Sequence, residues 1–201
     1  YGVLVSLILL GLGYLAGRKI SVVPTGAQNV FELIVGGLEE FMVDITGEEG
    51  RAFFPYIATV FLFIMFCNLI GLLPGFFSPT ANINTTLSLA LCTFAYTHYL
   101  GVKYHGVKYV KHFLGPIPAL APLFFPIELI GHFARVLSLT LRLFGNIMGE
   151  DLVLTILLFL AGMFLAPLPM MFLAVFTSVV QAFVFTLLSM MYFAGSMEHA
   201  H

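Results

Sequence analysis

The side chains best suited to chemistry lie in one apolar stretch, from Phe125 to Leu152. A helix advances about 100° per residue, so positions 128, 132, 135, 139, 142, 146 and 149 share one narrow stripe along its side. Ionisable groups on one face of such an apolar helix are expected to handle ions or protons. The polar residues of the stretch are Glu128, His132, Arg135, Arg142, Asn146, Glu150 and Asp151.

Arg142 is the most demanding of these residues. An arginine at bilayer depth costs between about 2.5 and 17 kcal/mol, and it cannot lose its proton to escape that cost. It therefore needs a partner or a water-filled cavity. Besides a functional role, it could be a snorkelling side chain or form a structural ion pair with Glu150. We favour the functional interpretation for Arg142 and leave both interpretations open for Arg135 and His132.

The composition is that of an integral membrane protein. Of the 201 residues, 60% are hydrophobic and only 9% are charged, and the mean hydropathy is +1.05. Soluble domains contain far more charged residues, about 25%. The net charge of −2 is spread over few groups, which argues against nucleic acid as a partner. Cys67 and Cys92 stand in apolar runs without metal-ligand spacing and are expected to be packing thiols.

The polar stretch belongs to the first of two long helices, predicted over 120–166 and 169–196. Pro122 and Pro126 interrupt only its start, where a first helical turn tolerates proline. About 40 residues at 1.5 Å each would span about 60 Å, twice the roughly 30 Å of a hydrocarbon layer. This helix must therefore tilt steeply or break, and Gly145 and Gly149 are the candidate weak points.

The remaining elements precede this long hairpin. Residues 1–17 are predicted to be the end of a first transmembrane helix whose start is missing, because the apolar run is short and the chain begins with Tyr1 rather than Met. Residues 27–46 form an amphipathic helix on the membrane surface, and 53–73 with 84–101 form a membrane hairpin. The prediction is thus an all-α integral membrane protein, one domain over 1–201, with about five membrane helices and one surface helix.

The loop charges set the expected orientation. Loops on the cytoplasmic side of membrane proteins are enriched in lysine and arginine. With the N-terminus on the outer side of the membrane and the C-terminus in the cytoplasm, every basic residue in a loop lies on the cytoplasmic side. These residues are Arg18, Lys19, Arg51, Lys103, Lys108 and Lys111.

Motifs for other functions are missing from the sequence. There is no internal repeat, phosphate-binding glycine loop, nucleophile elbow or zinc motif. His98 and His112 have a separation that two haem ligands on one helix could use, but a loop with glycines and lysines stands between them. We therefore expect neither enzymatic activity nor a cofactor.

Several stretches together resemble subunit a of F-type ATP synthases. They are VPTGAQNVFE at 23–32, NLIGLLPG at 68–75, SPTANINTTLSLAL at 78–91, PIE at 126–128, SLTLRLFGN at 138–146 and VQAF at 180–183. The resemblance implies a non-catalytic membrane stator that faces a rotating c ring, contacts b-type peripheral stalk subunits and lipid, and lies in a bacterial plasma membrane.

The resemblance also implies roles for single residues. Arg142 is similar to the family's essential arginine, which faces the ion-carrying carboxylate of each c subunit. Asn146 and Gln181 are similar to its polar neighbours, and Glu128 to a carboxylate of the cytoplasmic half of the path. Some members pair the position of Glu150-Asp151 with a histidine on the last helix, where this chain has Ala174. Glu150 is then expected to take that histidine's role.

The expected mechanism uses two aqueous half-channels on opposite sides of Arg142. A protonated c-subunit carboxylate can cross lipid and an ionised one cannot, so the ring turns only if each site loses and regains its proton at different places. Arg135 is expected to hold Glu128 or a lipid phosphate at the inner boundary. We assign Asn146, Glu150, Asp151 and Gln181 to the outer half-channel, and Glu128, His132 and Ser138 to the cytoplasmic one.

Two alternatives remain open on the sequence alone. The chain could be a self-contained proton channel or antiporter gated by Arg142 and Glu150, or a structural membrane anchor whose polar stripe only packs helices. The sequence does not decide between proton and sodium, because the selecting groups of the family lie mostly on the c subunit.

Overall fold

A computed structural model describes residues 1–18, 27–73, 75–106, 121–161 and 167–198, and the described part is almost entirely helical. Two short 3₁₀ helices are η1 (Glu48–Ala52) and η2 (Pro79–Ala81). The predicted all-α fold is confirmed, whereas Lys19, Lys108, Lys111 and His112 lie outside the described residues. The α-helices are α1 (Gly2–Arg18), α2 (Ala27–Thr46), α3 (Phe54–Ile70), α4 (Ile83–His105), α6 (Ala121–Ala161) and α7 (Pro167–Glu198).

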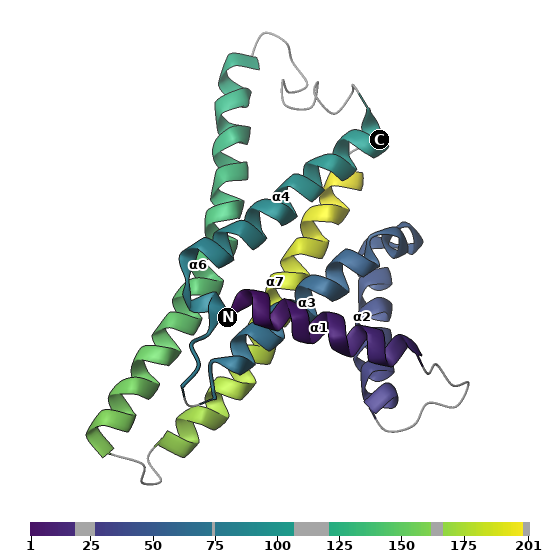
Figure 1. Cartoon of the computed structure of the whole chain (residues 1–201). Helices are drawn as coiled ribbons and strands as arrows, with labels where there is room; N and C mark the ends of the chain where they lie inside the picture. Colours follow the sequence, from purple (N-terminus) through teal and green to yellow (C-terminus); the bar gives the residue numbers. More distant parts are fainter. Residues whose placement is uncertain (19–26, 74, 107–120, 162–166, 199–201) are drawn as a thin grey trace.

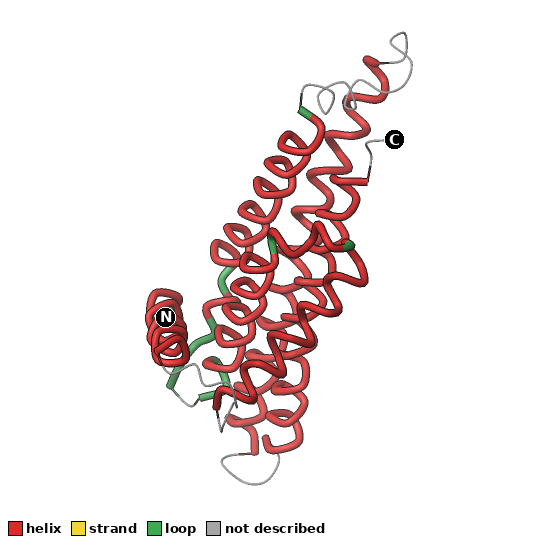
Figure 2. Tube along the Cα trace, turned by 90° about the vertical axis from the view of Figure 1, so that its right-hand side faces the viewer, coloured by secondary structure: helices red, strands yellow, loops and turns green. Residues whose placement is uncertain are grey.

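The two long C-terminal helices form the frame of the molecule. The end of α6 and the start of α7 lie side by side at the bottom of Figure 1, and the two helices diverge towards the other end. There α4 packs against both of them, while α3 and α2 pack on α7 and α1 packs on α3. Figure 2 shows the resulting elongated bundle, with α1 on one flank.

Length and apolar character single out the same two helices. The segments Phe125–Leu160 and Leu168–Met197 are long and apolar enough to cross a membrane, and α1 and α3 contain shorter apolar segments. Many of their large apolar side chains face outwards, such as Phe159 at 89% and Phe172 at 79% exposure. Such surfaces are covered by lipid or by protein partners. The number of five membrane helices stays a prediction.

The long helix α6 does not break at its glycines. It is continuous over 41 residues, and Gly145 and Gly149 are both helical. Figure 1 shows that α6 instead bends near its middle. The expectation for Pro126 was wrong, because it lies inside the helix rather than in its first turn. At 1.5 Å per residue, α6 is about 60 Å long and fits a membrane of about 30 Å only when inclined or bent.

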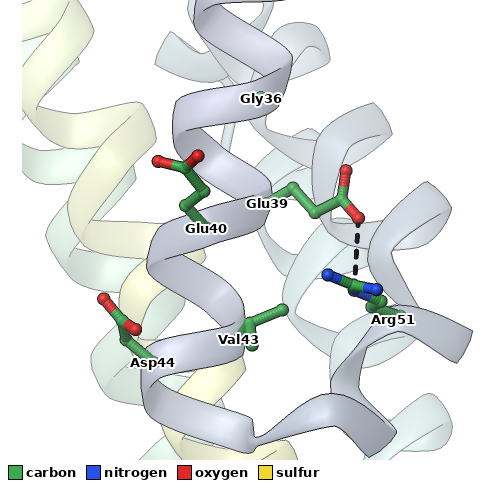
Figure 3. A pocket seen from close by; sticks show the side chains of 6 residues that line it. All are labelled: Gly36, Glu39, Glu40, Val43, Asp44 and Arg51. Carbon is green, nitrogen blue, oxygen red and sulfur yellow. Dashed lines mark ion pairs between the residues drawn. The ribbon is translucent and has the colours of Figure 1, made fainter.

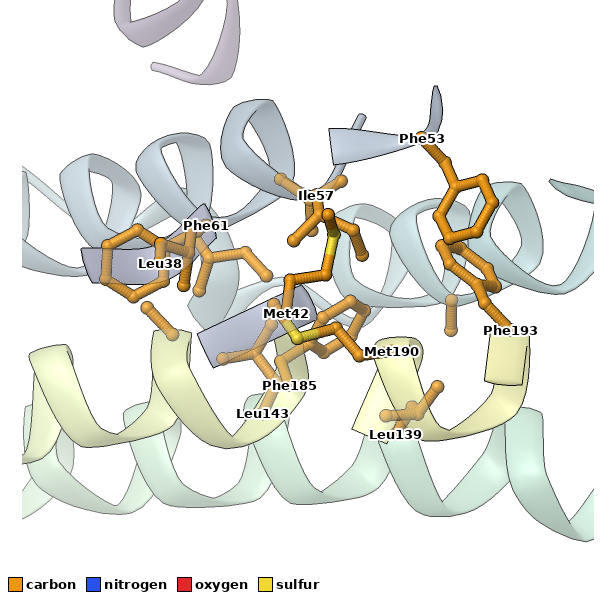
Figure 4. Packing of buried hydrophobic residues seen from close by; sticks show 14 of the residues in the cluster. Leu38, Met42, Phe53, Ile57, Phe61, Leu139, Leu143, Phe185, Met190 and Phe193 are labelled. Carbon is orange, nitrogen blue, oxygen red and sulfur yellow. The ribbon is translucent and has the colours of Figure 1, made fainter. Parts of the chain in front are cut away.

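The apolar core lies between α7 and the helices around it. Leu38 and Met42 of α2 and Leu139 and Leu143 of α6 are all buried in it. Figure 4 shows these side chains meeting those of α3 and α7. Because α2 contributes residues four apart while Glu40 and Asp44 remain exposed, α2 is amphipathic as predicted. The core fixes which face of α6 points inwards. From α3, α7 and the residue before α3 come Ile57, Phe61, Phe185, Met190, Phe193 and Phe53.

A buried polar network joins the η2 segment to the end of α3 and to α7. The Thr80 hydroxyl donates to the side-chain oxygen of Asn68 at 2.5 Å, and the Asn68 amide donates to the backbone oxygen of Ser178 at 3.3 Å. The Ser78 hydroxyl donates to the Cys67 carbonyl at 3.0 Å. All of these groups are buried, so their mutual hydrogen bonds replace those that water would supply.

Candidate functional site

The polar stripe of α6 runs along the border between two faces of the helix. One face, with Val136, Thr140 and Ile147, is buried against the rest of the chain. The opposite face, with Arg142 and Asn146, is exposed. The predicted stripe is therefore continuous along the helix but not uniform. Its members His132 and Leu139 are buried, while Arg135, Arg142 and Asn146 face outwards, together with Ser138.

Arg142 lies on this exposed face, and the ion pairs of the described residues do not include it. Among the described residues, no carboxylate oxygen lies within 4.0 Å of its guanidinium, since the ion pairs there involve other residues. The structural alternative of a pair with Glu150 is thus not formed. The face that carries Arg142 also contains Ser138 and Gly145, which are small and exposed. This arrangement leaves the charge open to a group outside the chain.

Two acidic residues follow Arg142 on the same helix, towards the end of α6 that lies beside the start of α7 (Figure 1). Glu150 and Asp151 are partly buried, and the Glu150 side chain interacts with the Thr177 side chain of α7. Gln181 lies one helical turn beyond Thr177 and is partly buried. The structure thus brings Glu150 next to Thr177 of α7, while the grouping of Glu150, Asp151 and Gln181 around one ion path stays a prediction. Ala174 is 3% exposed and offers no polar group there.

A second cluster lies near the N-terminal end of α6. The Nε2 atom of His132 is 3.5 Å from a carboxylate oxygen of Glu128, one turn away on the same helix. The His132 ring meets the His98 ring of α4 edge to face, with centroids 4.9 Å apart. Phe94 of α4 contacts both imidazoles. Sequence reasoning missed His98 as a site residue, because the pairing of α4 with α6 leaves no local signal.

Arg135 contacts an aromatic ring of α7. Its guanidinium carbon lies 5.6 Å from the ring centre of Tyr192 on α7, in a cation–π arrangement. Within the described residues Glu128 pairs with His132 instead of with Arg135. The Arg135–Glu128 contact is therefore not formed, and the other expected partner of Arg135, a lipid phosphate, stays a prediction.

A surface pocket of about 310 Å³ lies away from these groups, on α2. Figure 3 shows that Glu40 and Asp44 line it and that Arg51 points towards Glu39. The Arg51–Glu39 distance is 3.5 Å and the Arg51–Glu48 distance is 3.4 Å. These side chains are largely exposed, so the pairs contribute little to stability. The pocket shares no residue with either polar cluster of α6.

Comparisons with known proteins agree with the resemblance noted in the sequence. The model of the family "ATP synthase A chain" matches residues 1–194. The chain is 62% identical over its whole length to the ATP synthase subunit a of Syntrophobacter fumaroxidans, covering 84% of that protein. It is 61% identical over its whole length to that of Desulfosudis oleivorans, covering 88%. Over 99% of the chain it is 56% identical to that of Citrifermentans bemidjiense, covering 86%.

The family match covers nearly the whole chain. The first two relatives align with all of it, so every described helix lies within the similarity. The chain therefore belongs to the ATP synthase A chain family, the family of subunit a of F-type ATP synthases.

Proposed function

We propose that this chain translocates ions, most simply protons, past Arg142 and couples their passage to rotation of a c ring. Membership of the subunit a family supports a role in the ion-translocating membrane sector. The observation that carries the proposal is the exposed Arg142, which has no carboxylate partner among the described residues. A fixed charge on an apolar outer surface calls for an opposite charge on a partner.

The chemistry follows from the cost of a charge in lipid. Arg142 stabilises an ionised carboxylate on a passing c subunit, and it blocks direct proton transfer because it cannot release its own proton. Each elementary charge that crosses the full membrane releases about 2.3 kcal/mol per 100 mV, which drives rotation. The chain itself is a non-catalytic subunit in this mechanism.

The two half-channels lie on opposite sides of Arg142 along α6. Asn146, Glu150, Asp151 and Gln181 line the outer one, supported by the contact of Glu150 with α7. Glu128, His132 and Ser138 line the cytoplasmic one, supported by the Glu128–His132 pair. The end of α4, the start of α6 and the end of α7 lie at the same end of the molecule (Figure 1). We assign this end to the cytoplasm and the N-terminus to the outside, in a bacterial plasma membrane.

The partners follow from the same proposal. The face with Arg142 and Asn146 meets the c ring, the rest of the outer apolar surface meets lipid, and b-type peripheral stalk subunits hold the chain in place. Five helices cross the membrane in this arrangement, and α2 lies on its surface, where its exposed carboxylates contact water.

The proposal is tested by ATP-driven acidification of inverted vesicles that contain the whole complex with Arg142→Ala. We expect normal retention of the c ring and complete loss of pumping. Arg135→Gln is the matched control, because it removes a second arginine from the same helix, and it should reduce pumping without abolishing it. Near-normal pumping by Arg142→Ala would overturn the proposal.

The sides of the half-channels are tested by cysteine labelling. A cysteine at position 150 should react with a water-soluble reagent added to the outside. Labelling only from the cytoplasm would reverse the assignment of Glu150. Ion transport by the purified chain alone would instead favour the self-contained channel, and normal transport per assembled complex by Arg142→Ala would favour the structural anchor.

A further inference from the structure

We propose that His98 of α4 is a proton-transfer residue that connects the cytoplasmic aqueous phase to Glu128 through His132. This inference rests on the proposed function and extends its cytoplasmic half-channel to a second helix. It is carried by the side-chain geometry between α4 and α6.

The three groups form a chain of neighbours. The His98 and His132 rings meet edge to face with centroids 4.9 Å apart, and His132 Nε2 lies 3.5 Å from Glu128 Oε1. His98 is partly exposed, whereas His132 is only 8% exposed. Protons can therefore reach His98 more easily than His132, and His132 lies between His98 and the carboxylate.

The charges around the cluster favour onward transfer. From α6 it is faced by Glu128 and by Arg135, which acts electrostatically on His98. On α7, Tyr192 lies beside Arg135. A cation near His98 repels an imidazolium, while the Glu128 carboxylate attracts a proton. A proton that binds to His98 is therefore driven towards Glu128.

The proton balance of the relay is simple. A proton from water binds a ring nitrogen of His98, and the imidazolium then gives one proton to neutral His132. His132 donates its Nε2 proton to the Glu128 carboxylate, which becomes a neutral acid, and both rings return to their neutral form. Histidine suits this task because its charge changes near physiological pH. In the opposite direction of rotation the same steps run backwards.

The competing explanation is that His98 only packs against Phe94, whose ring centroid is 4.2 Å away. Two substitutions separate packing from proton transfer. His98→Phe keeps an aromatic ring in this contact but cannot carry a proton, and His98→Gln keeps a polar side chain without an imidazole. Tyr99→Gln is the matched control, since Tyr99 is the exposed neighbour on the same helix, at 58% exposure.

The experiment measures initial ATP-driven acidification of inverted vesicles in mildly alkaline medium, where protons are scarce at the cytoplasmic face. Rates are normalised to the amount of c ring retained. Because water partly replaces the imidazole, we expect both His98 variants to slow about tenfold, less than the roughly 100-fold or more contributed by many positioned acid–base groups. Free histidine in the medium, which does not cross the bilayer, should restore much of the rate, whereas free glutamine should not.

Each outcome decides a different question. Wild-type rates in His98→Phe and His98→Gln overturn this inference, as does a slow rate that free histidine fails to restore. Loss of the c ring in both variants also overturns it, because His98 is then a packing residue. Arg142→Ala is run in parallel: if it still pumps, the proposed function fails, and if it alone is inactive, only the relay fails.

Discussion

Replacing Gly71 by alanine should destabilise the chain through one steric contact. A methyl group built on Gly71 lies 2.6 Å from the Ser78 Cβ atom and 3.0 Å from the Ser78 Cα and N atoms. The backbone of Gly71 has φ −66° and ψ −19°, which alanine adopts without strain. The predicted cost therefore comes from the contact and not from the backbone conformation of residue 71.

The Ser78 residue cannot move aside without loss of other interactions. Its hydroxyl donates to the Cys67 carbonyl at 3.0 Å and lies 2.7 Å from the Thr80 hydroxyl. Overpacking costs about 1–3 kcal/mol, and a buried interhelical hydrogen bond in a membrane is worth about 0.6 kcal/mol on average. Alanine recovers about 0.4–1 kcal/mol, because it lowers the conformational entropy of the unfolded chain. We expect a net loss of about 2 kcal/mol.

The assay is heat denaturation of the purified complex in detergent, followed by size-exclusion chromatography of the intact fraction. By the scaling known for soluble domains of similar length, a loss of about 2 kcal/mol lowers Tm by about 4–8 °C. Gly37→Ala is the control, because nothing lies within 4 Å of the added methyl group and alanine favours the helix. If Gly71→Ala melts at or above the wild-type temperature, the packing argument is wrong.

Three further predictions use other parts of the structure. Asn68→Ala removes two buried hydrogen bonds and should lower stability by about 1–3 kcal/mol in the same heat assay. Arg51→Ala should change it by less than about 1 kcal/mol, because both ion pairs of Arg51 are largely exposed; a larger loss would show that they are coupled to the core. N-ethylmaleimide in detergent should label Cys92, which is exposed, and spare buried Cys67, so mass spectrometry should show one adduct per chain and not two.

The helices were largely predictable from the sequence because their signals are local. The amphipathic pattern of residues 27–46 and the long apolar runs after residue 120 depend only on spacing and composition. The path of α6 was less predictable, because glycine lowers helix propensity by only about 1 kcal/mol and packing overrides it. Gly145 and Gly149 therefore stay within a continuous helix.

The candidate site was predictable as a set of residues but not as a set of contacts. The 100° rule placed Arg142 and His132 on one stripe, yet one is exposed and the other buried, because α4 and α7 cover only part of α6. One of the two partners of Asn68, the backbone oxygen of Ser178, is 110 residues away along the chain. No local pattern shows that the polar segment near Thr80 is buried. The contact of His98 with His132 could not be predicted for the same reason, because it joins two helices.

In the proposed function the exposed face of α6 bears the force of a turning ring, and the Asn68–Ser178 hydrogen bond then has a mechanical consequence. Such a force reaches α7 through the buried core that Leu143 of α6 shares with α7. The Asn68 amide of α3 donates a hydrogen bond to the backbone oxygen of Ser178, at one position along α7. Under the proposed function this hydrogen bond opposes sliding of α7 along α3, so that α3 supports α7 against the force of the ring.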